Sequence, residues 1–392
     1  MFDVDRVRSR FSSLGQGFVF LDAPGGTQVP DSVGAAVARN FQEASGNIGF
    51  PYETSQRIAR LVDEARARSA AFLGCSAEEI IFGTNMTSLN FMMSRTLGRG
   101  LSSGDEILVT RLDHDGNVAP WLELARDRDL VVREVDIRED TTLDMEDLGR
   151  LMSPRTKVVA VPLASNALGT TVDVARVASL AHAAGALVWV DAVQYAPHFP
   201  IDVRALDADV LLCSSYKFCG PHLGIAYGRR QLLESWRPYK ARPVGDEPVG
   251  HRFETGTLPY ELLAALVATY EYLDEIGGID EVTAWERTLG ERLLAGLPEG
   301  ARLFGSRTMD GRVPTFLVNF DSVSSDDLSV ALAKEGFGVW SGDNYYALGL
   351  YERLAWGSAL RIGLAHYNTL EEIDRFNDTL GALVKDAAGS GR

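Results

Sequence analysis

The sequence predicts an α/β fold, with a large domain built on a mostly parallel sheet and a smaller α+β domain. Between residues 78 and 228, short apolar runs alternate with helix-like stretches, the pattern of strands joined by crossover helices. Continuous apolar strands are typical of a sheet with helices on both faces. Beyond about residue 280 the pattern changes to that of a separate α+β unit. A chain of 392 residues is long enough for both domains.

The elements of the large domain follow from local patterns. Apolar runs indicate strands at 79–84, 106–110, 131–137, 157–163, 187–190, 210–213 and 223–227. Helical periodicity indicates helices at 86–97, 118–128 and 174–184. The stretch 236–258 is rich in Pro, Gly and charged residues and predicts a long loop, and loops of that length are usually functional.

The small domain follows in the same way. Its predicted helices cover 282–294, 328–335 and the chain from 370 onward, and its predicted strands cover 313–320 and 360–364. We expect the large domain to span residues 16–270. The small domain would combine residues 1–15 with 271–392.

Composition narrows the function classes. The net charge of -16 argues against non-specific binding to nucleic acid. The three cysteines are too few and too scattered for a disulfide framework or a zinc site, so no metal is predicted. The N-terminus is charged and lacks a signal-peptide core, and no apolar stretch is long enough to span a bilayer. We therefore expect a cytoplasmic protein without membrane partners.

Polar side chains collect where the predicted strands end. Ligands of open parallel sheets bind beyond the carboxyl ends of the strands, so these side chains are expected to converge on one site. They come from five strands and are Thr84 and Asn85, His114, Ser165 and Asn166, Asp191 and Gln194, and Ser214 to Lys217.

Lys217 and Asp191 carry most of the chemical information. A lysine at the end of a buried strand is costly, and a strand-end carboxylate upstream of it suggests a pyridoxal 5'-phosphate (PLP) site. Taken singly, each residue has a simpler explanation: Asp191 as a turn residue, Lys217 as a solvated amine, His114 as a structural histidine. Asn85 could merely cap the helix that begins at Met86. Together, however, these groups fit one ligand, a phosphorylated pyridine aldehyde.

The roles follow from the chemistry of PLP. Lys217 would form the Schiff base and act as general base at the substrate Cα, and Asp191 would keep the pyridine nitrogen protonated. His114 would stack on the ring. The remaining predicted ligands are Asn166 and Gln194 near the ring hydroxyl, and Ser214 with the backbone of Asn85 and Met86 at the phosphate.

Arg361 is the predicted substrate-binding residue. In the strand 360–364, Leu360 and Ile362 share one face and Arg361 points to the other. A guanidinium can bind an α-carboxylate with two hydrogen bonds. The alternative is an ordinary charge on a surface strand.

Nearly the whole chain resembles the class V (fold-type I) PLP-dependent aminotransferases, close to the cysteine desulfurase branch. The resemblance rests on linked motifs in order: His114–Trp121, Ser165–Thr170, Asp191–Gln194, Ser214–Lys217, Arg252–Thr257 and Arg361–Asn368. It implies a homodimer with shared active sites, in which Thr257 reaches the phosphate of the neighbouring subunit.

Two departures from the desulfurase pattern shaped the functional prediction. Tyr345 stands about where the sulfur-accepting loop cysteine should be, and Asn85-Met86 replaces part of the usual phosphate turn. The chain therefore resembles a desulfurase-like subgroup without the catalytic cysteine. We expect a PLP-dependent lyase or transferase that acts on an amino acid or cysteine S-conjugate, with Tyr345 near the substrate. The first expectation is a C–S β-lyase, with aminotransferase activity or decarboxylation-coupled oxidative deamination as alternatives and true cysteine desulfurase activity disfavoured.

Overall fold

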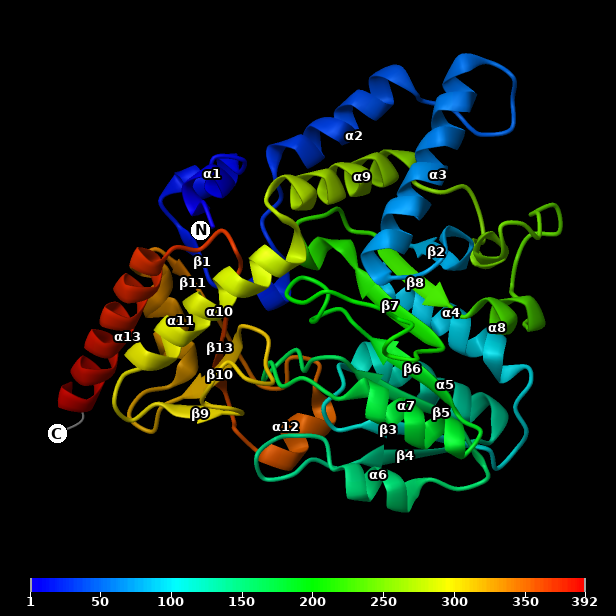
Figure 1. Ribbon diagram of the computed structural model, residues 1–392. Coiled ribbons are helices and arrows are strands. Elements are labelled where there is room, and N and C mark those ends of the chain that lie inside the picture. Colours follow the sequence, from blue (N-terminus) through cyan, green and yellow to red (C-terminus); the bar gives the residue numbers. More distant parts are fainter. Residues whose placement is uncertain (1, 391–392) are drawn as a thin grey trace.

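The computed structural model describes residues 2–390 and contains the predicted large sheet (Figure 1). Its seven strands lie in the order β2-β8-β7-β6-β5-β3-β4. All run in one direction except β8, which is antiparallel to both of its neighbours. The strands are β2 Ile80–Gly83, β3 Glu106–Thr110, β4 Val131–Val135, β5 Thr156–Pro162, β6 Leu187–Asp191, β7 Val210–Ser214 and β8 Gly224–Gly228. The α/β fold with a mostly parallel sheet is thus confirmed.

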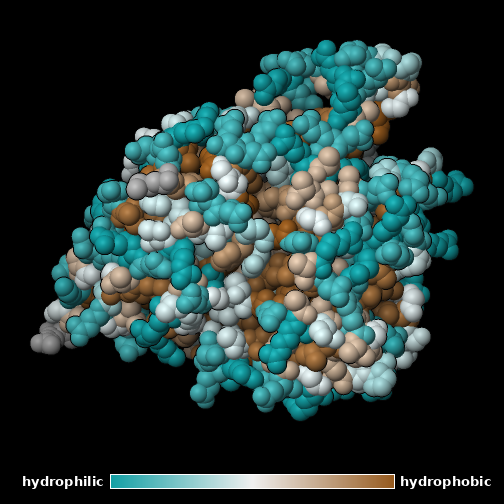
Figure 2. All heavy atoms as spheres, viewed as in Figure 1, coloured by the Kyte–Doolittle hydropathy of each residue, from teal (hydrophilic) through white to brown (hydrophobic). Residues whose placement is uncertain are grey.

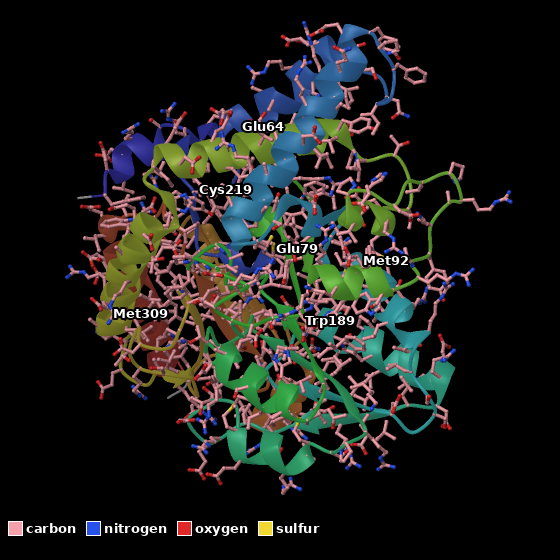
Figure 3. All side chains as sticks on the ribbon, turned by 45° about the vertical axis from the view of Figure 1, so that its right-hand side comes forward. Glu64, Glu79, Met92, Trp189, Cys219 and Met309 are labelled. Atoms are coloured by element: carbon pink, nitrogen blue, oxygen red, sulfur yellow. The ribbon has the colours of Figure 1, made fainter. Side chains whose placement is uncertain are left out.

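Helices cover both faces of this sheet, as the apolar strands required. In β5, Val158 and Ala160 pack with helices α4 (Met86–Gly98) and α5 (Ala119–Arg128) on one face. Side chains on the other face pack against α3 (Glu53–Leu73), α7 (Val174–Ala183) and α9 (Tyr260–Glu275). Trp189 of β6, labelled in Figure 3, packs on the face covered by α4 and α5. Its ring meets that of Trp121 of α5 edge to face, with centroids 4.9 Å apart.

A second, antiparallel sheet forms the small domain. Its order is β12-β13-β10-β9, with strands β9 Arg302–Phe304, β10 Thr315–Asn319, β12 Trp340–Gly342 and β13 Ala359–Gly363. Apolar residues of α10 (Gly278–Gly296), α11 (Ser325–Lys334) and α13 (Leu370–Ser390) complete its core. The short strand β1 (Val19–Phe20) pairs in parallel with β11 (Phe337–Gly338), so the N-terminal segment joins this part of the molecule.

The remaining helices are peripheral. Helix α2 (Asp31–Glu43) lies along α9, and both it and α3 extend to one end of the molecule (Figure 1). The others are α1 Val4–Arg8, α6 Met145–Leu151, α8 Arg230–Ser235 and α12 Leu348–Leu354. No helix within residues 2–390 is long and apolar enough to cross a membrane. Hydrophilic residues cover most of the face in Figure 2, and apolar residues gather near its middle.

Most predicted elements lie within a few residues of the observed ones. The long loop is present between α8 and α9, interrupted by a 3-10 turn at Val249–Phe253. Helices α2, α3 and α9 were not among the predicted elements. The predicted limits of the two domains stay a prediction.

Candidate active site

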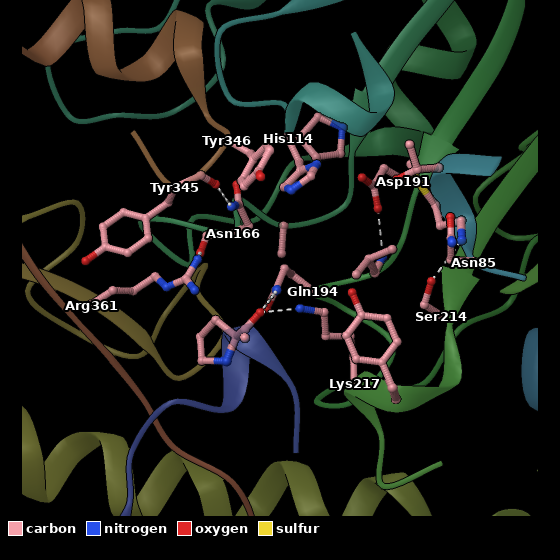
Figure 4. Close-up of a pocket in the computed structure, with 18 of the residues that line it drawn as sticks. Asn85, His114, Asn166, Asp191, Gln194, Ser214, Lys217, Tyr345, Tyr346 and Arg361 are labelled. Atoms are coloured by element: carbon pink, nitrogen blue, oxygen red, sulfur yellow. Dashed lines mark hydrogen bonds between the residues drawn. The ribbon is translucent and has the colours of Figure 1, made fainter. Parts of the chain in front are cut away.

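The strand ends converge on one cavity of about 970 Å³ between the two sheets (Figure 4). The large domain and the segment near β13 both contribute to its wall. Among the predicted residues, Thr257 does not line this cavity within the single chain, and neither do Ser165 and Ser215 of the strand-end set. Those that line it are Asn85, Met86, His114, Asn166, Asp191, Gln194, Ser214, Lys217, Tyr345 and Arg361.

Lys217 lies at the end of a 3-10 turn that follows β7, and its side chain is buried. Its Nζ donates a hydrogen bond to the carbonyl of Pro24. The pKa of this amine is lowered to about 7, first by burial and then by the charge of Arg361, while Asp191 and Asp22 oppose the shift. Near neutral pH a large fraction of the amine is therefore unprotonated and able to act as nucleophile or base.

Asp191 is the last residue of β6 and is also buried. Its Oδ1 accepts a hydrogen bond from the backbone N–H of Val193 at 2.8 Å. Burial raises the pKa of this carboxyl to about 6, although the Val193 N–H and Lys217 act in the opposite direction. A cationic partner in the cavity would favour the ionised form.

The start of α4 forms a cradle for an anion. Asn85 caps the helix, accepting from the N–H of Ser88 at 2.8 Å, and Ser214 Oγ accepts from the N–H of Met86 at 3.0 Å. Gly224 of β8 lies against this turn, because a Cβ there would come within 2.5 Å of the Asn85 carbonyl carbon. Polar groups and a helix N-terminus thus face one end of the cavity.

His114 lines the cavity and caps the 3-10 turn Asp115–Asn117. Its Nδ1 accepts the N–H of Gly116 at 2.9 Å, so the neutral ring carries its proton on Nε2. Burial, and then the charges of Lys217 and Arg361, lower the pKa of His114 to about 4. Its ring stacks on Tyr346 with centroids 5.4 Å apart.

The side-chain amides of Gln194 and Asn166 also line the cavity. Gln194 Nε2 donates to the Pro24 carbonyl at 2.9 Å, the acceptor that Lys217 also uses. Asn166 Nδ2 donates to the carbonyl of Tyr345 at 2.7 Å. Within residues 2–390, the buried Oδ1 of Asn166 has no hydrogen-bond partner. An unpaired buried acceptor of this kind calls for a donor from a bound molecule.

Arg361 enters the cavity from β13 and is buried. Leu360 and Ile362 point into the small-domain core, as the alternation predicted. One guanidinium N–H donates to the carbonyl of Asn166 at 3.2 Å, and no carboxylate forms an ion pair with Arg361 within residues 2–390. Burial lowers the pKa of Arg361 to about 10, so it stays a cation near neutral pH, and several of its N–H donors are available to a ligand.

Asp22 was missed at the sequence level. Burial raises its pKa, Arg361 and Lys217 lower it, and its buried Oδ1 has no partner. The signal was present, since Asp22 ends the apolar run 18–21, as Asp191 ends its own strand. Trp340 was also missed, because only the register of β12 against β13 places it opposite Arg361.

These residues fit PLP. The cavity combines an anion cradle, a buried carboxylate, an unpaired amide oxygen and an amine of lowered pKa, which match the phosphate, the pyridine nitrogen, the ring hydroxyl and the aldehyde. The fold and the site therefore define a PLP-dependent enzyme. Residues 19–376 match the family Aminotransferase class-V, and the chain belongs to that family.

Similar proteins are cysteine desulfurases by name. One from Synechococcus elongatus is 31% identical over 98% of this chain, although the chain spans 63% of that relative's length. One from Haloferax volcanii is 31% identical, with 93% of this chain and 89% of the relative covered. The cysteine desulfurase structure from Thermococcus onnurineus has a TM-score of 0.92 at 27% identity, covering 97% of this chain and 98% of that one. CsdA from Escherichia coli has a TM-score of 0.88 at 28% identity, covering 99% and 98%.

These comparisons correct the functional prediction. The expectation of a C–S β-lyase, with its alternatives and with cysteine desulfurase activity disfavoured, is wrong, because the similar proteins are named cysteine desulfurases over nearly the whole chain. That expectation rested on one missing cysteine, at the position of Tyr345. The predicted family, PLP dependence and broad enzyme class are confirmed.

Proposed function

We propose that this protein is a cysteine desulfurase that transfers the sulfur of L-cysteine to a thiol outside its own chain. The observation that carries the proposal is the pairing, in one cavity, of a lysine with lowered pKa and a buried arginine that forms no ion pair within residues 2–390. The relatives' names supply the amino acid. The roles of individual residues below are part of the proposal.

Substrate binding depends on Arg361. Its guanidinium has five N–H donors, and one of them is used by the Asn166 carbonyl. The others are available for two parallel hydrogen bonds to an α-carboxylate, which would fix the substrate between Arg361 and Lys217.

Proton transfer at Cα would fall to Lys217. With a pKa of about 7, the amine can both remove and return a proton near neutral pH. PLP, when bound, supplies the electron sink for the pair left on Cα. Asn85, Met86 and Ser214 would hold its phosphate, and Asp191, Asn166 and Gln194 its ring. His114 would stack on the ring face, with its Nε2–H free to donate.

The sulfur acceptor must come from elsewhere. Cys213 and Cys219 are buried, Cys75 is half-buried, and none lines the cavity (Figure 3 shows Cys219). Burial raises the pKa of Cys75 and Cys219 to about 12, and also raises that of Cys213. Because the thiolate is the nucleophile, these groups are poor acceptors near neutral pH.

The transfer balances with one external thiol. The acceptor thiolate attacks the substrate sulfur, an S–S bond forms, and the Cβ–S bond breaks with its electron pair left on carbon. Protonation of that carbon gives L-alanine. The sum is L-cysteine plus R–SH giving L-alanine plus R–S–SH, with no further oxidant.

We further propose a homodimer in which Thr257 serves the partner's site. Thr257 lies outside the cavity of its own chain, near the end of the long loop 236–258. The cytoplasmic location and the domain limits stay predictions.

The test is alanine formation from L-cysteine. PLP-loaded protein should release L-alanine in proportion to added dithiothreitol or 2-mercaptoethanol, and Lys217→Ala should release none. Cys75→Ser serves as a matched control and should retain the activity. Release of pyruvate in place of alanine, or no turnover with any thiol, would reject the proposal.

A further inference from the structure

Two aromatic rings lie beside the guanidinium of Arg361. Its Cζ lies 4.3 Å from the ring centroid of Tyr345 and 5.2 Å from that of Trp340. Trp340 is the direct cross-strand partner of Arg361 between β12 and β13, and Tyr345 follows in the loop after β12 (Figure 4 shows Tyr345 beside Arg361). We call Tyr345 and Trp340 the aromatic clamp.

The ring of Tyr345 is firmly held. Its hydroxyl lies 2.7 Å from the carbonyl oxygen of Ala359 and 3.0 Å from that of Trp340. Its own carbonyl accepts the amide of Asn166. Tyr345 has a φ of 50°, in the left-handed region, so these hydrogen bonds hold a backbone conformation that a tyrosine rarely adopts. The side chain is buried and oriented toward Arg361.

The position of the Trp340 side chain depends on a glycine. It packs on Gly25, where a Cβ would lie 3.0 Å from the indole ring. About half of Trp340 remains exposed at the mouth of the cavity. The glycine therefore allows the indole to approach the cavity wall closely and face Arg361.

The aromatic clamp stabilises the buried positive charge of Arg361. A buried cation needs a partner, but a carboxylate partner would compete with the carboxylate of a substrate. Aromatic faces attract a guanidinium without taking its hydrogen-bond donors. Arg361 has one carbonyl acceptor and two rings beside it, and it feels the charge of Asp22 without forming an ion pair with it, so most of its N–H groups stay available.

We propose that Tyr345 and Trp340 are positioning residues that hold Arg361 ready for an α-carboxylate and so select amino acids over simple amines. The inference builds on the proposed function but concerns binding alone. It also gives Tyr345 a role other than sulfur acceptance.

The test compares two ligands of the PLP-loaded protein by calorimetry. L-Alanine carries the α-carboxylate, and ethylamine lacks it. Tyr345→Leu and Trp340→Leu keep apolar volume but lose the aromatic face, and each should weaken L-alanine binding about fivefold. Ethylamine binding should not change. Tyr345→Phe and Trp340→Phe should retain the affinity for L-alanine.

Tyr239→Ala is the matched control. Tyr239 stacks on Arg99 at 3.8 Å, outside the cavity, so this variant should bind both ligands as the wild type does. Wild-type L-alanine affinity in the Leu variants, or equal loss of both ligands, would overturn the clamp. L-Alanine binding requires no sulfur transfer, so the two proposals can fail separately. If the wild type forms no alanine from L-cysteine but the Leu variants lose affinity for L-alanine alone, the desulfurase proposal is rejected and the aromatic clamp is supported.

Discussion

The lowered pKa of Lys217 should be visible in the rate at which the protein without PLP takes up the cofactor. Only the neutral amine attacks the aldehyde, so the rate should rise with pH and reach half its plateau at about pH 7. Stopped-flow absorbance between pH 5.5 and 9.5 measures this profile. Nα-acetyl-lysine, treated with PLP in parallel, corrects for the titration of PLP itself.

The magnitude follows from the two pKa values. An ordinary lysine with a pKa near 10.5 is neutral in only about 0.03% of molecules at pH 7, whereas a pKa of about 7 leaves roughly half of the amines neutral. The fraction of reactive amine is therefore raised on the order of a thousandfold. The cause is burial of the side chain at the end of β7, with Arg361 as the next contribution.

Arg361→Gln separates these two causes. Removing the guanidinium should raise the pKa of Lys217 and move the half-maximal rate to higher pH by about one pH unit, because a nearby positive charge disfavours the protonated amine. Lys217→Ala should abolish the absorbance change that accompanies Schiff-base formation with PLP. A wild-type midpoint above pH 9, or a shift to lower pH in Arg361→Gln, would refute the reasoning.

Three further changes test the cradle and its support. Ser214→Ala removes the acceptor of the Met86 N–H and a group at the anion cradle, and should weaken PLP binding about fivefold in a fluorescence titration; unchanged affinity would contradict the cradle. Gly224→Val should abolish PLP binding, since its Cβ would clash with Asn85. The control Gly149→Ala, whose Cβ would meet no atom within 4 Å, should bind PLP normally. Arg66→Met breaks the buried ion pair with Glu254 at 2.5 Å and should lower the free energy of unfolding, measured in urea, by about 3 kcal/mol. Arg57→Met, which breaks an exposed ion pair, is the control. An equal loss in the two variants would show that burial does not increase the cost of breaking the pair.

The sequence was most informative where several polar residues follow apolar strands and fit one ligand as a set. Lys217 and Asp191 end apolar strands, and a parallel sheet brings such ends together, so the cavity could be predicted without coordinates. Arg361 followed from the period of two along its strand. Asp22 carried the same strand-end signal, but its strand β1 is only two residues long and pairs outside the large sheet.

Tyr345 shows where prediction from the sequence fails. A tyrosine at this position predicts only that the loop thiol is absent, and the similarity of nearly the whole chain to proteins named cysteine desulfurases outweighs that absence. In the structure the ring of Tyr345 faces Arg361, its hydroxyl bonds to the backbone of β13 and its carbonyl bonds to Asn166. None of these contacts follows from a local pattern, because each joins residues that are distant in sequence or depends on strand register. A tyrosine at this position therefore does not by itself decide which reaction the site supports.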